Sequence, residues 1–277
     1  MIDLHAHTSA SDGTYSPNEL VTLAKSEGIE AIAITDHDTI EGVPEALESG
    51  EKIGLEVIPG VEISIDHQPG SMHVLGLFLD IKNKKLIEYL TVLQASRSSR
   101  NPKIIEKLNE LGLAISMEDV QKISGGGQVG RPHIAAALLK DGYVSSNQQA
   151  FDKYLKKGAI AYFERSRLTR EETVDMIHGA GGLVILAHPN TLGVNGSSFS
   201  YLMSELKEVG FDGLEVFYNS HSQTDEDRLM KIVDKNGFII SGGTDFHGQN
   251  KPSIKLGVGY GNMAIPYEVL QEMKRQL

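Results

Sequence analysis

Residues 1–13 read MIDLHAHTSASDG: a short apolar segment runs directly into His5 and His7, and Asp12 follows. Side chains two positions apart on a β-strand point to the same face of the sheet. The pattern therefore directs two imidazoles to one point at the end of the first expected strand. Two polar residues in a loop would explain the pattern equally well, so the choice between these two interpretations depends on the rest of the chain.

Later apolar segments end in the same residue types. Residues 31–38 (AIAITDHD) carry His37, residues 57–62 (VIPGVE) end in Glu62, residues 181–189 (GGLVILAHP) carry His188, and residues 238–247 (FIISGGTDFH) carry Asp245 and His247. In an α/β barrel, the C-terminal strand ends meet at one mouth. Buried polar side chains without partners would be costly there, so the repeated pattern predicts a metal site.

The order of the expected elements favours an α/β fold, because short apolar segments alternate with helical patterns. The helix expected at residues 16–28 is well marked: Ser16 and Glu19 can form a capping box, Pro17 suits the first turn and Gly28 suits the end. The expected strands are residues 2–5, 31–35, 57–65, 73–79, 183–187, 213–217 and 238–241.

Composition excludes several classes of protein. The chain has 277 residues, a formal charge of −11 and no cysteine. Disulfides, thiolate zinc sites and a cysteine nucleophile are therefore excluded, and the negative charge argues against binding to duplex DNA or to an anionic membrane. No apolar segment approaches membrane-spanning length and no signal-peptide pattern opens the chain, so we expect a cytoplasmic protein. The sequence does not indicate an oligomeric state.

Residues 82–182 interrupt the alternation, because they carry helical patterns but no convincing strand. In residues 103–111 (KIIEKLNEL) the apolar side chains share one helical face, and residues 124–142 (SGGGQVGRPHIAAALLKDG) are typical of a glycine-rich loop that opens a helix. We therefore expect residues 1–81 and 183–277 to form a barrel and residues 82–182 to form a helical insertion that acts as a lid.

His73 begins its apolar segment instead of ending it, so a parallel strand would place it at the wrong end of the barrel. Residues 61–79 (VEISIDHQPGSMHVLGLFL) alternate with period two on both sides of a polar turn at residues 67–71. An antiparallel return would bring His73 beside Ser64 and diagonal to Glu62. The sequence therefore predicts one antiparallel pair in a mostly parallel barrel.

Several ordered motifs resemble those of the PHP (polymerase and histidinol phosphatase) domain family: DLHAHTSASDG, AITDHD, GVEIS, HVLGL, AHP and TDFHG. Within that family, the chain is most similar to the branch of 3′,5′-nucleoside bisphosphate phosphatases and RNase AM. Members of that branch also carry a helical insertion with a GRPHIA-like segment, here residues 130–135. The resemblance implies a distorted (β/α)7 PHP barrel with a helical insertion and a trinuclear metal site.

The resemblance also implies nine metal ligands, among which Glu62, Asp245 and His188 are the expected catalytic residues. The implied ligands are His5, His7, Glu62 and Asp245 for the first ion, Glu62 again with His73 and His188 for the second, and Asp12, His37 and His247 for the third. Many members of the family have His where this chain has Asp12, which predicts a weaker third site. We expect two or three divalent ions, with Mn²⁺ first and Fe²⁺ or Zn²⁺ as alternatives.

Outside the metal ligands, Arg131 and His133 are expected to bind phosphate, because they lie in a glycine-rich loop at a helix N-terminus. A surface arginine and a capping histidine are the alternative interpretation. His221 matches a family position and is explained equally well by a substrate contact or by loop polarity. Arg97 and Arg100 also match family positions, although a solvated helix face explains them nearly as well.

We therefore expect a metal-dependent phosphoesterase that acts on a small nucleotide, such as a 3′,5′-nucleoside bisphosphate (for example pAp to AMP), or on the 5′ end of a short RNA. Bound cations would acidify a water and neutralise phosphoryl oxygens. Asp36 and Asp38 are candidates for a leaving-group acid or, more simply, for orienting ligand histidines. The alternatives are another phosphomonoesterase (a cyclic-phosphate hydrolase or a histidinol phosphatase) and a non-catalytic metal-binding module.

Overall fold

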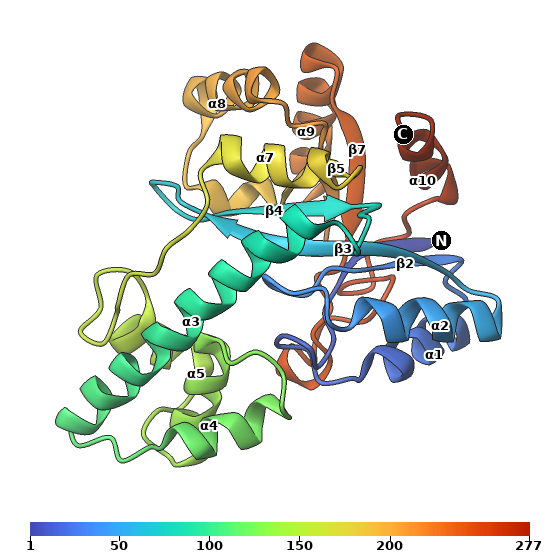
Figure 1. Cartoon of the computed structure of the whole chain (residues 1–277). Helices are drawn as coiled ribbons and strands as arrows, with labels where there is room; N and C mark the ends of the chain where they lie inside the picture. The colour runs from blue at the N-terminus through green and yellow to red at the C-terminus, as the bar shows by residue number, and fades with distance from the viewer.

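The computed structural model describes all residues from 1 to 277. Its centre is one seven-stranded sheet in which the strands follow chain order. The sheet is nearly closed, because β1 lies beside β7 as well as β2 and the His7 amide donates to the Phe246 carbonyl (Figure 1). The expected distorted barrel is confirmed. The strands are β1 (Ile2–Ala6), β2 (Ala31–Ile34), β3 (Glu56–Ile65), β4 (Met72–Leu77), β5 (Leu183–Ala187), β6 (Gly213–Tyr218) and β7 (Ile239–Gly243).

The one reversal of strand direction lies where the sequence predicts it. β4 runs antiparallel to both β3 and β5, and the other neighbouring strands of the sheet run parallel. Ser64 pairs with His73, so the predicted hairpin register is confirmed. The pairing of His73 with Ala187 brings it next to the residue that precedes His188. The reversal therefore returns His73 to the mouth of the barrel.

Helices cover the outside of the barrel, as the alternating pattern predicts. The first of them begins with the expected capping box between Ser16 and Glu19 and has Pro17 at its first position. No helix combines the length and the apolar character that a bilayer crossing requires. The covering helices are α1 (Pro17–Ser26), α2 (Val43–Ile53), α7 (Arg170–Gly179), α8 (Gly196–Val209), α9 (Gln223–Asn236) and α10 (Tyr267–Lys274).

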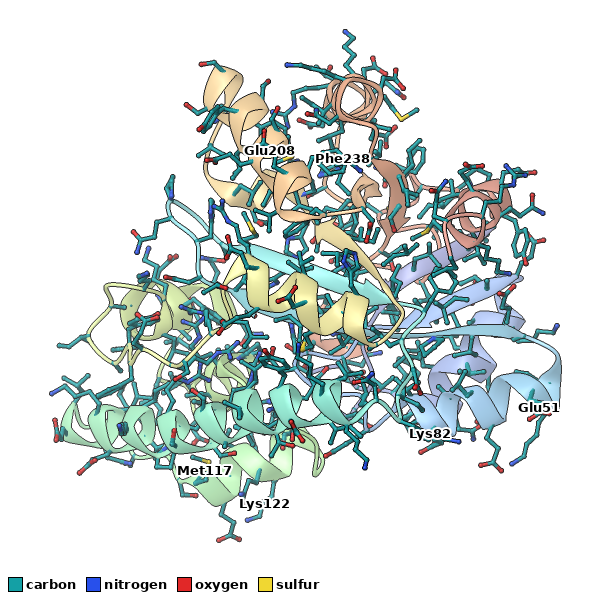
Figure 2. All side chains as sticks on the ribbon, turned by 45° about the horizontal axis from the view of Figure 1, so that its top comes forward. Glu51, Lys82, Met117, Lys122, Glu208 and Phe238 are labelled. Atoms are coloured by element: carbon teal, nitrogen blue, oxygen red, sulfur yellow. The ribbon has the colours of Figure 1, made fainter.

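The segment between β4 and β5 contains helices and no strand, as expected. α3 (Lys84–Glu110) runs away from the barrel, and α4 (Met117–Ser124) and α5 (Arg131–Lys140) pack near its far end (Figure 1). α6 (Asn147–Ala150) and the π-helix η1 (Phe151–Leu155) follow. Figure 2 labels Lys82 shortly before α3 and Met117 and Lys122 in α4, on one side of the molecule.

The insertion has a hydrophobic core of its own. Ile104, Leu108, Val120, Ile134 and Leu138 belong to this cluster and are buried. Leu86, Leu90 and Leu93 of α3 and the buried apolar face of α7 contribute instead to the barrel core. The division of the chain at residues 82 and 182 stays a prediction.

Candidate active site

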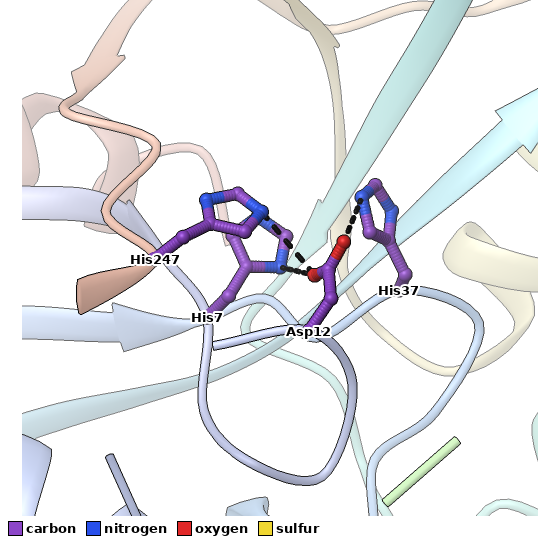
Figure 3. A group of neighbouring side chains, drawn as sticks. All are labelled: His7, Asp12, His37 and His247. Atoms are coloured by element: carbon purple, nitrogen blue, oxygen red, sulfur yellow. Dashed lines mark ion pairs between the residues drawn. The ribbon is translucent and has the colours of Figure 1, made fainter. Parts of the chain in front are cut away.

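The strand ends bring the nine expected ligands to one mouth of the barrel. His5 and Glu62 lie within β1 and β3, and the loops after β2, β5 and β7 supply His37, His188 and Asp245. Figure 3 shows Asp12 reaching from the loop after β1 toward His7, His37 and His247. Chain segments that are far apart in sequence therefore converge on one point.

Glu62 lies at the centre of the cluster, and its two oxygens face different imidazoles. Oε1 lies 2.7 Å from His73 Nδ1 and 3.1 Å from His188 Nε2. Oε2 faces three further rings, at 3.3 Å from His5 Nε2, 3.2 Å from His7 Nε2 and 3.1 Å from His37 Nδ1. A carboxylate with an oxygen in each of two donor sets suits a bridge between two cations.

Asp12 is the centre of a second group of facing imidazoles (Figure 3). Its Oδ1 lies 3.2 Å from His247 Nε2 and 3.7 Å from His7 Nδ1, and its Oδ2 lies 3.9 Å from His37 Nε2. Only one of these distances is within ordinary hydrogen-bond range. The looser spacing leaves room for an ion among the four side chains.

Asp245 completes the cluster from the end of β7. Its Oδ1 lies 3.2 Å from His7 Nε2 and 3.5 Å from His5 Nε2. Its Oδ2 points away from the imidazoles and accepts hydrogen bonds from the Tyr218 hydroxyl at 3.0 Å and from Lys251 Nζ at 2.7 Å. Tyr218 and Lys251 therefore hold this carboxylate with one oxygen toward the cluster, a role that sequence patterns did not indicate.

The donor atoms fit divalent metal ions. Buried atoms without a hydrogen-bond partner include His5 Nε2, both ring nitrogens of His7, His37 Nδ1 and Glu62 Oε2. Unpaired buried polar atoms are rare in folded proteins, and a bound ion is one of their standard explanations. These side chains form three donor groups, and within each group the ligand atoms lie within 4.8 Å of one another. The groups are His7, Asp12, His37 and His247; His5, His7, Glu62 and Asp245; and His37, Glu62 and His73.

The charges of the cluster favour cation binding. Burial alone would raise the pKa of Glu62, but the facing histidines hold it well below its usual range, and the pKa of Asp12 behaves alike. The pKa of Asp245 is also held well below its usual range, first by Lys251 and then by histidines. Burial lowers the pKa of His37 to about 3. Burial also opposes the charged form of His7, but the carboxylates beside it prevail and raise its pKa to about 9. The carboxylates are therefore ionised at neutral pH and available as ligands.

Backbone strain is concentrated in the same place. Of the four residues other than glycine with positive φ, three are Asp38 (φ 54°), His188 (φ 29°) and Asp245 (φ 53°). Such conformations cost free energy and persist where the surrounding structure imposes them, commonly at functional sites. Two of the three are expected metal ligands, and the third follows the ligand His37.

Glu215, on β6, is a functional residue that the sequence reasoning missed. It is 0% exposed. Its Oε1 lies 2.9 Å from His5 Nδ1, and its Oε2 accepts a hydrogen bond of 2.6 Å from the His188 amide. A proton on His5 Nδ1 leaves Nε2 free to face the cluster. The sequence does contain a pattern that indicates this role, because an acidic residue inside the apolar segment GLEVFY needs a buried partner.

Asp36 and Asp38 do not hydrogen-bond to ligand histidines, contrary to the simpler expectation for them. Asp36 accepts hydrogen bonds from the amide and hydroxyl of Thr8 and from the Ser11 hydroxyl, at 2.6–2.8 Å. It therefore fixes the loop that carries Asp12. Asp38 pairs with two arginines, at 2.6 Å from Arg97 Nε and 3.0 Å from Arg165 Nη2.

A cavity of about 560 Å³ lies between the insertion and the cluster of nine expected ligand side chains, which we call the metal cluster. Asp12, His37 and His73 line its inner end. Aromatic side chains and a set of cations line the remainder, and Arg131 lies among them with its guanidinium 5.5 Å from the Tyr162 ring. The cations are Arg97, Arg100, Arg131, Lys156, Lys157, Arg165 and Arg167.

The other two expected substrate residues do not line this cavity. His133 is buried, and its Nδ1 accepts a hydrogen bond from the Gly130 amide, which is the capping arrangement. His221 is also buried: its Nδ1 lies 2.8 Å from the Val216 carbonyl, and its Nε2 has no hydrogen-bond partner. A direct contact of either histidine with substrate stays a prediction.

Comparisons with known proteins agree with this geometry. A family model described as PHP domain matches residues 3–167. A 5′-3′ exoribonuclease of Haemophilus influenzae is 36% identical over 247 residues, which cover 88% of this chain and 89% of that protein. A 3′,5′-nucleoside bisphosphate phosphatase of Chromobacterium violaceum is 29% identical, with 92% and 90% covered. A crystal structure assigned as a metal-dependent phosphoesterase, from Bifidobacterium adolescentis, superposes with a TM-score of 0.87 at 30% identity and covers 99% of this chain and 95% of its own.

Proposed function

Because this chain belongs to the PHP domain family, we propose that it is a metal-dependent phosphoesterase that hydrolyses phosphate esters of nucleotides. The observation that carries the proposal is the placement of Glu62 between two donor sets, directly beside a cationic cavity. Acidic and imidazole donors bind the cations, and the arginines bind the anionic substrate.

The substrate class that we propose is a 3′,5′-nucleoside bisphosphate or the 5′ end of a short RNA. The Chromobacterium relative is named for the first substrate and the Haemophilus relative for 5′-3′ exoribonuclease activity. In the reactions that we propose for this chain, the ester at O3′ is broken and the 5′-phosphate of the nucleotide remains intact. One binding mode serves both: the 3′-phosphorus lies at the metal cluster, and the 5′-phosphate enters the cationic cavity.

The proposed roles follow from the contacts. Glu62, Asp245 and His188 are the catalytic residues of the proposal, since they hold the cations at the reacting phosphate. Divalent cations bound there would acidify a water and neutralise charge on the phosphoryl oxygens. Glu215 keeps the His5 ring oriented. Arg131 offers a planar fork that matches a phosphate, and its Nη1 is steadied by the Leu155 carbonyl at 2.9 Å.

We propose two or three divalent ions, with Mn²⁺ first and Fe²⁺ or Zn²⁺ as alternatives, because histidine and carboxylate donors are mixed. The nine ligands are those derived from the sequence resemblance. His7 and His37 each lie in two of the three donor groups and share the group that contains Asp12. The third ion, near Asp12, is the one expected to bind most weakly.

A hydrolysis panel with added Mn²⁺ tests the proposal. The substrates are adenosine 3′,5′-bisphosphate, mononucleotides, histidinol phosphate, cyclic phosphates and short 5′-phosphorylated RNAs. We expect turnover of the bisphosphate or the RNA that a chelator abolishes. Preference for a cyclic phosphate or histidinol phosphate would replace the proposed substrate class, and hydrolysis of no substrate would favour a non-catalytic metal-binding module.

A further inference from the structure

The cavity holds more positive charge than a single remote phosphate requires. Seven cationic side chains line it, and Asp12, which belongs to the metal cluster, is the one carboxylate among its lining residues. The chain as a whole carries a formal charge of −11. The local excess of cations is therefore a specific feature of this cavity and is not a consequence of overall composition.

Some of these cations are already paired within the protein. Asp38 neutralises part of the charge of Arg97 and Arg165, which both bind its Oδ2. Arg167 pairs with Glu164 at 2.7 Å. Arg97 and Arg165 lie on the side of the cavity near His37, since their partner Asp38 follows His37 directly in the chain.

Arg100, Arg131 and Lys157 have no carboxylate within 4.0 Å. The guanidinium of Arg100 donates to Asn101 Oδ1 at 2.8 Å, and Arg131 donates to the Leu155 carbonyl. Arg100 is only 4% exposed. Burial, and then repulsion from the neighbouring arginines, lowers the pKa of Arg100. An enclosed set of cations that repel one another is stabilised by an anionic ligand.

Arg131 is half-buried, whereas Lys156 and Lys157 are exposed at the opening of the cavity. Arg131 contacts the carbonyl of Leu155, the last residue of η1, and Lys156 and Lys157 follow it directly. The Lys156 side chain is 58% exposed and pairs with the exposed Asp152 at 3.0 Å, so it lies at the open rim. A ligand that extends from the metal cluster past Arg131 therefore reaches the lysines next.

We propose that this cavity binds a 5′-diphosphate, so that the enzyme accepts nucleotide units whose 5′ end carries two phosphates. The inference rests on the proposed function, in which the 3′-phosphorus occupies the metal cluster. The inner 5′-phosphate would contact Arg100 and Arg131, and the outer one would contact Lys156 and Lys157. A 5′-diphosphate carries about three negative charges at neutral pH, which equals the number of cations without a carboxylate partner.

The reaction leaves the 5′-diphosphate unchanged. Water adds to the 3′-phosphorus, the bond from phosphorus to O3′ breaks, and O3′ takes a proton. A free nucleotide gives a nucleoside 5′-diphosphate and inorganic phosphate. An RNA end gives a nucleoside 5′-diphosphate and a shortened RNA with a new 5′-phosphate. The two sources share the 5′-diphosphate and differ in what lies beyond O3′.

The test compares kcat/KM for adenosine 3′,5′-bisphosphate with kcat/KM for adenosine 3′-phosphate 5′-diphosphate. A parallel arm compares RNA oligonucleotides with a 5′-monophosphate and a 5′-diphosphate. The variants are Lys156→Ala/Lys157→Ala and, as a matched control, Lys140→Ala/Lys153→Ala, which removes two exposed lysines that do not line the cavity. Calorimetric binding of AMP and ADP to the metal-loaded proteins gives a readout independent of turnover.

We expect the wild type to use the 5′-diphosphate substrate at least as well as the bisphosphate. The Lys156→Ala/Lys157→Ala variant should lower the ratio of kcat/KM for the 5′-diphosphate substrate to kcat/KM for the bisphosphate about tenfold. Its preference for binding ADP over AMP should fall by the same factor. The control variant should change neither quantity. Rejection of the 5′-diphosphate by the wild type, or equal losses on both substrates, would overturn the inference. If neither substrate is hydrolysed, the proposed function fails, and the calorimetry still decides what the cavity binds.

Discussion

Glutamine in place of Glu215 is the most informative single substitution around the metal cluster. The carboxylate lies between two buried donors, His5 Nδ1 at 2.9 Å and the His188 amide at 2.6 Å. Glutamine has nearly the same shape but only one acceptor oxygen, and its amide group would face one of these donors. One of the two hydrogen bonds must therefore be lost.

The size of the effect follows from these contacts. A buried donor left without its partner costs about 1–3 kcal/mol, so the free energy of unfolding of the metal-free protein should fall by about that amount. Loss of a carboxylate that orients a ligand histidine typically lowers metal affinity about 10- to 100-fold, which corresponds to about 1.4–2.7 kcal/mol. Glu215→Gln should therefore bind metal more weakly and still fold, since a domain's total stability is about 5–15 kcal/mol.

The assay measures Mn²⁺ affinity by competition with a chromophoric chelator, together with chemical unfolding of the metal-free protein. Glu208→Gln, on the exposed surface of α8, is the matched control. Metal affinity of Glu215→Gln within about twofold of the wild type, against the 10- to 100-fold loss expected, would refute the positioning role. A loss of stability without a loss of affinity would show that Glu215 supports only the fold.

Four further predictions use other parts of the site. Asp245→Ala should lower metal content and abolish hydrolysis while circular dichroism stays unchanged; full turnover under chelation would contradict it. The ion beside Asp12 should exchange first during graded dialysis, because Asp12 Oδ2 lies as far as 3.9 Å from His37 Nε2. Loss of all ions in one step would count against this. Arg131→Ala should lower kcat/KM for adenosine 3′,5′-bisphosphate about ten- to hundredfold and leave p-nitrophenyl phosphate nearly unaffected; equal losses would assign Arg131 to the chemical step. The pKa of His7 is raised to about 9 without metal, so a cation must displace the proton of His7 in order to bind. The apparent Mn²⁺ affinity should therefore rise with pH up to about 9 and then level off. An affinity that does not change with pH would refute this competition.

The alternation of strands and helices and the convergence of ligand-type residues could be predicted from local patterns, whereas the distorted barrel was implied by the resemblance to the PHP family. Five of the seven expected strands have an expected ligand near or shortly after their C-terminal end, and the sheet carries such ends to one mouth. The position of His73 followed from period-two alternation on both sides of a short turn. Its pairing with Ser64 confirms the register that the alternation predicted.

The cationic cavity could be predicted only in part, because tertiary packing assembles it. Arg165 and Arg167 lie in a segment without helical or strand pattern, and only the fold brings them beside Arg97. The periodic pattern at residues 103–111 marks only the end of a longer helix, because α3 runs from Lys84 to Glu110. Neighbours in space that are distant in the chain leave no periodic signal.

Reloading the metal-free protein with Mn²⁺ tests the central claim most directly. Bound metal per chain and phosphate release from adenosine 3′,5′-bisphosphate are measured on the same samples as the ion is titrated back. The account predicts no phosphate release from the metal-free protein and a return of activity in step with occupation of the cluster around Glu62. Phosphate release from the metal-free protein at the full rate would contradict it.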